Sequence, residues 1–361
     1  MNLQIIETLS GSPSTTYSIA KATFDASSAS LQFQTGAGTG DSLNVDLSNG
    51  NPIPTGGESF SSTGGNSALS VTGSGSADTI SVSNTAVTLF GSSPISYSNV
   101  ANITLDTGAG DDVVTYNGPT TAAFAFHGGT GNDTLNVNSG SLSFNTDVQT
   151  DTSSLSLNVQ TGASVLFGSV EHLAALNLSG GSASLLAGGA NTLVLSSLKV
   201  TGSGQLDIND NPVILNYTDI AVLTDIRAYL ATGRGAPSNM AATWLGPGGI
   251  ISTVANLIGN GFNVAIGYAD NVGLAGVNST GSYTAFGGQT VASQTILIKM
   301  TLGADANLDG AVDGSDVAIL GTHFEKPDSG QWYLGDFDYS GTCDGGAVAL
   351  LGTTFGKTLP T

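Results

Sequence analysis

The chain has 361 residues, and only 9% of them are charged, with 27 Asp and Glu against 7 Lys and Arg for a formal net charge of −20. Nucleic acid is excluded as a partner, because binding to phosphates needs clustered Lys and Arg. No apolar run is long enough for a membrane-spanning helix. The single cysteine, Cys343, excludes an intrachain disulfide framework and a paired-cysteine metal site.

The composition predicts a mainly β protein. Asp outnumbers Glu and Lys, and 51 residues are Gly, which together favour strands joined by tight turns over helices. A surface of Ser, Thr, Asn and Gly is common in secreted bacterial proteins, so we expect an extracellular or cell-surface location. The first residues, Met1 to Gln4, lack the charged and apolar regions of a signal peptide. We therefore expect an exported form to have lost its leader or to be part of a longer chain.

From about residue 30 to 215 a Gly-rich turn, often ending in Asp, is followed by alternating apolar and polar residues. This alternation predicts strands with one buried face. Four Asp residues precede apolar residues at the same two offsets, namely Asp41, Asp78, Asp112 and Asp133.

The tripeptide Leu-Asn-Val or Leu-Asn-Leu recurs at 43–45, 135–137, 157–159 and 176–178, with the last three copies 22 and 19 residues apart. This spacing suits one coil of a solenoid, in which each coil buries its apolar face against the next. We predict a parallel β-helix or β-solenoid over residues 1–212. A pair of antiparallel β-sandwiches, which also have short strands at regular intervals, is the alternative.

Residues 213–301 are predicted to form a small mixed α/β segment that links or caps the solenoid. A helix is expected within 219–230, ended by Gly233, and a second short helix over 251–259. Strands are expected around 262–268 and 290–301. The pattern indicates no function for this segment.

Residues 302–361 contain an internal repeat with an offset of 31, in which 313–324 matches 344–355. A calcium ion prefers six or seven oxygen ligands, and a twelve-residue loop supplies them from positions 1, 3, 5, 7, 9 and 12. In the first loop Gly310 at position 6 permits the sharp turn. The predicted ligands of this first Ca²⁺ site are Asp305, Asn307, Asp309, the carbonyl of Ala311, Asp313 and Asp316.

The second loop is a degenerate copy of the first. Ala347 occupies the position of the twelfth ligand, so we expect weak binding or an empty structural loop. Cys343 is predicted to be a buried, inert thiol. The remaining predicted ligands of this second site are Asp336, Asp338, Ser340, the carbonyl of Thr342 and Asp344.

Each loop leads into one helix, 316–324 or 347–355, and the apolar faces of the two helices are predicted to pack together. This loop-helix pair without an entering helix resembles the type I dockerin module over residues 303–357. The resemblance implies a secreted protein that needs Ca²⁺ to fold this module, and a partner of the cohesin type or another cell-surface component. The recognition positions of that family hold small residues here, Gly314, Ser315, Gly345 and Gly346, which suits the dockerin-like tails of surface proteins.

Residues 128–135 fit a GGxGxD calcium nonapeptide, and 107–114 form a near copy, so both resemble the turns of repeats-in-toxin β-rolls. A β-roll site needs two such turns stacked in register. The two copies are isolated and 21 residues apart, which favours ordinary Gly-Asp turns at Asp112 and Asp133.

No catalytic residues are predicted. His127, His172 and His323 stand outside any recognisable catalytic motif. The interpretation is therefore a calcium-binding structural or adhesive surface protein. The alternative is a component of a polysaccharide-degrading system, such as a glycoside hydrolase, a lyase or a carbohydrate-binding subunit, delivered by the dockerin-like module.

Overall fold

The computed structural model describes residues 2–7, 15–20, 30–34, 41–62, 66–89, 91–118, 122–148, 153–236, 242–262, 264–277, 281–327 and 329–359. The chain divides into two compact units. The first consists of Met1–Phe144 with Val148–Ser164, and the second of Asn145–Asp147 with Val165–Thr361. Both the 1–212 and 213–301 segments defined from sequence therefore contribute to the second unit. No helix within the described ranges is long and apolar enough to cross a membrane.

The first unit is built of strands, as the alternation predicted. They are β1 (Asn2–Glu7), β2 (Thr15–Ala20), β3 (Leu31–Gln34), β4 (Ser42–Asp46), β5 (Glu58–Ser61), β6 (Ala68–Thr72), β7 (Thr79–Ser83), β8 (Ala86–Leu89), β9 (Ile95–Ser98), β10 (Asn102–Asp106), β11 (Val113–Asn117), β12 (Ala123–His127), β13 (Gly131–Phe144) and β14 (Ser153–Gln160).

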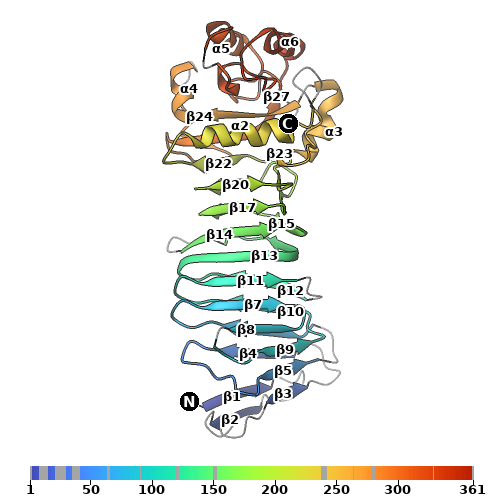
Figure 1. Cartoon of the computed structure of the whole chain (residues 1–361), viewed down its shortest axis with the longest axis vertical. Helices are drawn as coiled ribbons and strands as arrows, with labels where there is room; N and C mark the ends of the chain where they lie inside the picture. Colours follow the sequence, from blue (N-terminus) through green and yellow to red (C-terminus); the bar gives the residue numbers. More distant parts are fainter. Residues whose placement is uncertain are drawn as a thin grey trace. The chain divides into compact units, whose positions relative to one another are not determined.

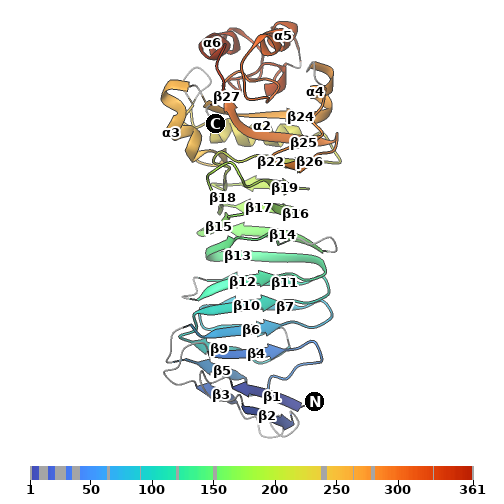
Figure 2. The same ribbon diagram turned by 180° about the vertical axis from the view of Figure 1, so that it is seen from behind.

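Most strand pairs in the first unit are parallel. One sheet has the order β12-β10-β6-β4, and its three pairs are all parallel. It is seen in Figure 2, whereas β7, β11 and β13 lie one beyond the next in Figure 1. In that second sheet β7-β8 and β8-β9 pair antiparallel, while β3-β5, β5-β9, β7-β11, β11-β13 and β13-β14 are parallel. Parallel pairing of this extent is not the pattern of the antiparallel sandwiches considered from sequence.

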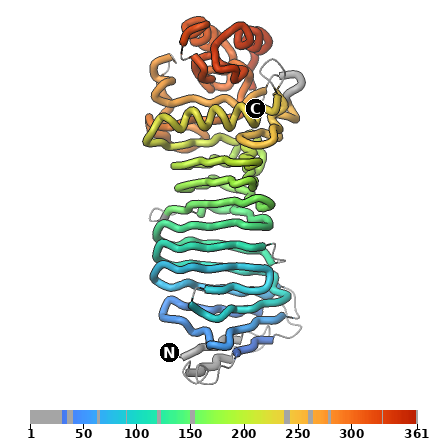
Figure 3. The backbone as a smooth tube through the Cα atoms, in the orientation of Figure 1, coloured from blue at the N-terminus to red at the C-terminus, as the bar shows by residue number. Residues whose placement is uncertain are grey.

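The alternating pattern produces columns of buried side chains in the first unit. Leu69 of β6 lies in register with Leu43 of β4 and Ile103 of β10, and all three are buried. The repeated tripeptides 135–137 and 157–159 also lie in register, and Asn158 Nδ2 donates to Asn136 Oδ1 at 2.8 Å. Each strand therefore buries its apolar face by stacking on the equivalent positions of its neighbours. Figure 3 shows the backbone of this unit running in successive parallel layers.

The apolar residues that follow the four Asp residues at the shared offsets are buried in every case, as predicted; they are Leu43 and Val45, Ile80 and Val82, Val114 and Tyr116, and Leu135 and Val137. Asp78, Asp112 and Asp133 precede or begin equivalent paired segments of β7, β11 and β13. Asp41 precedes β4, which belongs to the four-stranded sheet instead. A shared offset to the next apolar residues fixes which side chains point inward, but it does not fix which sheet the strand joins.

The second unit combines short strands with five helices among its described residues. Its elements are β16 (Glu171–Leu173), β17 (Ala175–Ser179), β18 (Ser182–Leu185), β19 (Leu193–Leu195), β20 (Leu198–Thr201), β21 (Gln205–Asp207), β22 (Val213–Asn216), α2 (Val222–Gly233), β23 (Gly249–Ile251), α3 (Thr253–Phe262), β24 (Val264–Asp270), α4 (Asn271–Val277), β25 (Ala285–Phe286), β26 (Gln289–Thr290), β27 (Thr295–Leu302), α5 (Gly314–His323), the 3₁₀ helix η1 (Trp332–Leu334) and α6 (Gly345–Thr354). The strand β15 (Ala163–Phe167) lies at the boundary of the two units.

The predicted elements of the 213–301 segment are present. The helices α2 and α3 match the two expected helices, and β24 and β27 match the two expected strands. The order of the main sheet is β16-β19-β22-β27-β24, and β27 pairs antiparallel with both neighbours. Every residue of β24 is buried, which places this strand at the centre of the packing beneath the C-terminal loops.

Candidate metal centre

Loop one, residues 305–316, connects β27 to α5. Asp313 caps α5 by accepting the backbone N–H of Ser315, and Asp316 completes a capping box by accepting the N–H of Asp313 at 2.9 Å. The capping arrangement holds the last predicted ligand, Asp316, against the start of the loop. Asp305, Asn307 and Asp316 are almost completely buried, whereas Asp309 and Asp313 are exposed.

Backbone amides orient the two buried carboxylates of loop one. Asp305 Oδ1 accepts from the N–H of Asp309 at 3.1 Å, and Asp305 Oδ2 accepts from the N–H of Gly310 at 2.9 Å. Asp316 Oδ1 accepts from the N–H of Ala306 at 2.8 Å. Gly310 has a φ of 91°, a left-handed conformation that glycine adopts at little cost. The sequence prediction that Gly310 makes the sharp turn is confirmed.

The two buried carboxylates of loop one have raised pKa values. Burial, with added repulsion from Asp316 and Asp309, raises the pKa of Asp305 to about 7. Burial likewise raises the pKa of Asp316 to about 6, and Asp309 adds repulsion. Two buried carboxylates in one loop are costly when both are ionised, unless a positive charge compensates them.

The remaining predicted ligands of loop one bond to the loop itself. Asn307 Nδ2 donates to Asp309 Oδ2 at 2.8 Å, and Asp313 Oδ1 accepts from Ser315. Within the described part of the chain, no group of three or more His, Cys, Asp or Glu side chains is placed to hold a metal ion. Two of the six predicted ligands, the Asn307 side chain and the Ala311 carbonyl, are not His, Cys, Asp or Glu side chains. Loop one therefore buries Asp305, Asn307 and Asp316, while Asp309 and Asp313 accept hydrogen bonds from Asn307, Ala311 and Ser315.

Loop two, residues 336–347, precedes α6 and repeats the backbone pattern of loop one. The N–H of Gly341 donates to Asp336 Oδ2 at 3.0 Å, as Gly310 does to Asp305, and Asp344 caps α6 by accepting the N–H of Gly346 at 2.8 Å. Asp336 and Asp338 are buried, whereas Ser340 and Thr342 are exposed. Ala347 is fully buried where loop one has Asp316.

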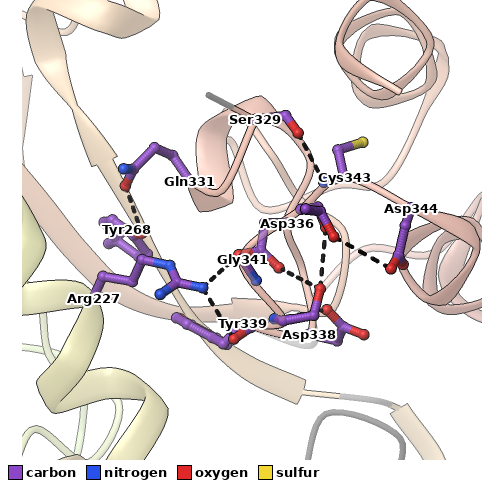
Figure 4. Close-up of polar contacts among 12 residues, drawn as sticks. Arg227, Tyr268, Ser329, Gln331, Asp336, Asp338, Tyr339, Gly341, Cys343 and Asp344 are labelled. Atoms are coloured by element: carbon purple, nitrogen blue, oxygen red, sulfur yellow. Dashed lines mark hydrogen bonds and ion pairs between the residues drawn. The ribbon is translucent and has the colours of Figure 1, made fainter. Parts of the chain in front are cut away.

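Arg227 of α2 is a residue of this region that sequence spacing does not reveal. Its Nη2 donates to Asp336 Oδ2 and to the carbonyl oxygen of Tyr339, both at 3.1 Å (Figure 4). Arg227 and Asp336 are 109 residues apart in the chain. No local pattern joins the two, and only the packing of α2 against loop two brings them together.

The prediction that the apolar faces of the two loop-helices pack together is wrong for most of their residues. Val317 and Phe324 of the first segment, and Val348 and Phe355 at the equivalent positions of the second, are 37–56% exposed. The helix α5 instead buries Ile319 and Leu320, and α6 buries Ala347 and Thr354. Cys343 is buried as predicted, and burial raises the pKa of its thiol to about 11.

The two GGxGxD turns are not isolated, contrary to the prediction from their spacing. Ala109 and Thr130 form a parallel bridge, and the N–H of Thr130 donates to the carbonyl of Gly108 at 2.9 Å. A Cβ on Gly129 would lie 1.7 Å from the Gly108 oxygen, so this close stacking requires glycine. Turns 21 residues apart in the chain are therefore stacked, because they precede the parallel neighbours β11 and β13.

A ladder of Asp side chains connects the stacked turns. Asp112 Oδ1 accepts the backbone N–H of Asp78 at 2.7 Å, and Asp133 Oδ1 accepts the N–H of Asp112 at 3.0 Å. Asp112 and Asp133 are buried, and burial raises the pKa of both. Asp112 Oδ2 is buried without a hydrogen-bond partner. The ladder satisfies backbone amides at the turns and leaves excess negative charge there.

His172 forms a pair with Asp147, although its sequence context indicated no partner. The Nδ1 of His172 lies 2.5 Å from Asp147 Oδ2, and its backbone N–H donates to Asp147 Oδ1 at 3.1 Å. The Nδ1 of His323 bonds to the carbonyl of Ile319 in its own helix. These contacts position the two imidazoles structurally.

No family model, curated protein or solved structure shows significant similarity to this chain.

Proposed function

We propose that this chain is an extracellular structural or adhesive protein in which a β-solenoid carries a dockerin-like, calcium-stabilised C-terminal module. The observation that carries the proposal is the placement of the Asp305 and Asp316 carboxylates inside loop one, where neither is ion-paired with Lys or Arg among the described residues. Oxygen ligands on a twelve-residue loop with glycine at position 6 are the donor set that Ca²⁺ prefers.

The chemistry of loop one fits a hard divalent cation. A bound Ca²⁺ would supply two positive charges beside the carboxylates, which offsets the burial and the added repulsion that raise their pKa values. Asp305, Asn307, Asp309, the Ala311 carbonyl, Asp313 and Asp316 are the residues that would hold it. In the proposal, Asp309 and Asp313 exchange their loop hydrogen bonds for the ion.

The solenoid part of the proposal is supported by the parallel register of β7, β11, β13 and β14 and by the stacked turns at 108–112 and 129–133. A rigid stack of this kind provides a spacer or an adhesive surface without catalytic residues. The surface composition of Ser, Thr, Asn and Gly supports an extracellular location.

Calcium titration of the chelator-treated full chain by isothermal calorimetry tests the proposal. The variant Asp305→Asn, Asp309→Asn keeps side-chain oxygens that can accept the loop amides but removes two charges, and we expect it to lose Ca²⁺ binding. Asp338→Asn in loop two is the matched control and should leave the binding unchanged. Equal Ca²⁺ binding by the wild type and the loop-one variant would sink the assignment.

A second role for the same module, docking onto a protein partner, is favoured by the exposed apolar side chains of the two loop-helices. Val317, Phe324, Val348 and Phe355 form two equivalent pairs related by the offset of 31 residues. Exposed apolar residues at repeated positions are typical of association surfaces. The partner proposed is a cohesin-like or other cell-surface protein.

The docking role is tested by binding of the full chain to a panel of immobilised cohesin domains. The variant Phe324→Asp, Phe355→Asp should lose binding while retaining its Ca²⁺ titration, and Leu257→Asp, at an exposed apolar residue of α3, is the control. Binding that survives in the first variant would contradict the docking surface.

A further inference from the structure

Loop two is joined to the rest of the second unit through its first predicted ligand. The side chain of Asp336 is 1% exposed and forms an ion pair with Arg227, whose side chain is 26% exposed. Figure 4 shows the guanidinium of Arg227 directed from α2 toward Asp336 and the backbone at Tyr339. The contact therefore links α2 to loop two at the position where a calcium loop begins.

The two loops differ in what donates to the equivalent oxygen. In loop one, Asp305 Oδ2 accepts from the N–H of Gly310 and from the hydroxyl of Thr301. In loop two, Asp336 Oδ2 accepts from the N–H of Gly341 and from the guanidinium of Arg227. A neutral donor in the first copy is thus replaced by a positive charge in the second.

Loop two also contains fewer carboxylates than loop one. Loop one carries Asp305, Asp309, Asp313 and Asp316, and the nearby Lys299 ammonium donates to the carbonyl of Leu308, not to a carboxylate. Loop two carries only Asp336, Asp338 and Asp344, since position 12 is Ala347. The buried Arg234 interacts electrostatically with Asp338 and Asp336, so two arginines act on Asp336 and one of them on Asp338 as well.

Loop two is also anchored by an aromatic side chain. The ring of Tyr339 lies 5.7–6.0 Å, between centroids, from the rings of Trp244, Tyr268 and Trp332. Its hydroxyl donates to the carbonyl of Ile266 in β24, a fully buried strand at the end of the five-stranded sheet. The backbone that carries Tyr339 is the same segment whose carbonyl accepts from Arg227. Loop two is therefore held to the rest of the unit by the packing of the Tyr339 ring as well as by Arg227.

We infer that Arg227 supplies, from within the chain, the positive charge that a calcium ion supplies to an intact loop, so that loop two serves as an ion-independent lock between α2 and the C-terminal module. The inference rests on the proposed function only where it assigns Ca²⁺ to loop one. The physical reason is that a buried carboxylate needs a compensating charge, and a guanidinium held by packing provides one without a free ion.

The first test is the Ca²⁺ stoichiometry of the full chain by calorimetry. We expect one ion per chain, and none in the variant Asp305→Asn, Asp309→Asn. A second ion that is lost on Asp336→Asn would overturn the inference while leaving the proposed function intact. If neither loop binds Ca²⁺, the proposed function fails, and the lock is judged by the second test alone.

The second test is a double-mutant cycle of Arg227→Gln and Asp336→Asn, measured as unfolding midpoints in excess chelator. Arg227→Gln leaves a buried carboxylate uncompensated, so we expect a lower midpoint that Asp336→Asn partly restores. Arg227→Lys keeps the charge and should lose less. Thr224→Glu, at an exposed position of α2, changes the net charge equally and should leave the midpoint unchanged. Additive effects of the two substitutions would contradict the lock.

Discussion

The indole N–H of Trp332 donates a hydrogen bond to the backbone carbonyl oxygen of Asp305, at 2.7 Å, inside the second unit. Both residues are fully buried, and Asp305 is the first predicted ligand of loop one. The chain has only two tryptophans, Trp244 and Trp332. The fluorescence of Trp332 therefore reports directly on the start of the candidate calcium loop.

The first prediction is that Ca²⁺ changes the tryptophan emission of the chelator-treated chain through Trp332. Ordering of loop one alters the electrostatic field around the Trp332 indole, because the carbonyl that accepts the indole hydrogen bond belongs to Asp305 of this loop. The change should persist in Trp244→Phe and disappear in Asp305→Asn, Asp309→Asn. A change lost in Trp244→Phe instead would show that the signal arises away from loop one.

The second prediction concerns pH in the absence of Ca²⁺. The pKa of Asp305 is raised from 3.8 to about 7 and that of Asp316 to about 6, so the folded state binds more protons than the unfolded state between about pH 4 and 7. Stability is then present at the acidic end of this range and falls as the pH rises through it, by up to about 7 kcal/mol for the two shifts together. Urea unfolding followed by tryptophan fluorescence measures it.

The control for this pH dependence is Asp305→Asn, which removes the titrating group but keeps an acceptor for the amide of Gly310. The slope of stability against pH should flatten in this variant. Saturating Ca²⁺ should flatten it in the wild type as well, since the ion holds both carboxylates ionised. An unchanged slope in Asp305→Asn would assign the titration to other groups.

The third prediction is that Gly129→Ala strongly destabilises the first unit. A Cβ at Gly129 would lie 1.7 Å from the carbonyl oxygen of Gly108 in the stacked turn, and the φ of 73° adds strain. We expect a loss of about 3 kcal/mol or more in the free energy of unfolding. Gly162→Ala is a matched control, because Gly162 has a φ of 84° and open space around it, and should cost about 1 kcal/mol. Circular dichroism during urea unfolding compares the two, and equal losses would contradict the stacked turns.

The fourth prediction concerns the Asp ladder. Asp133→Ala removes the acceptor of the Asp112 backbone N–H and leaves a buried donor unsatisfied, at a cost of about 1–3 kcal/mol. Asp133→Asn removes the charge as Ala does but keeps an oxygen at the same place, so it should cost less than Asp133→Ala. The free energies of unfolding of the two variants are the measurement. An equal or larger loss for Asn than for Ala would show that the hydrogen bond to the Asp112 N–H does not stabilise the turns.

The strand alternation and the element order of the second unit could be predicted because both follow from neighbouring residues. The tripeptides at 135–137 and 157–159 lie in register as their spacing suggested. The shared offset of Asp41 and Asp78 predicted the buried faces of β4 and β7, but not that these strands belong to different sheets. Periodicity specifies the buried face of a strand, while the choice of neighbouring strand depends on the path of the intervening chain.

The candidate site was predictable only within each loop. The spacing of Asp305, Gly310 and Asp316 predicted a twelve-residue loop with its turn at Gly310, and the hydrogen bonds that hold this loop span at most ten residues. The prediction that the apolar faces of the two helices pack together is wrong for Val317 and Phe355, because both are exposed. An apolar stripe shows that a face is suited to burial, but a partner must be present to cover it.

By itself, the sequence determined the alternating strands, the twelve-residue spacing of loop one and the loss of the last ligand in loop two, because these are properties of consecutive residues. The tertiary structure alone decided that the turns 21 residues apart are stacked, and that Arg227 compensates Asp336 across 109 residues. The physical reason is that the register between parallel strands and the pairing of buried charges both depend on which distant segments pack together.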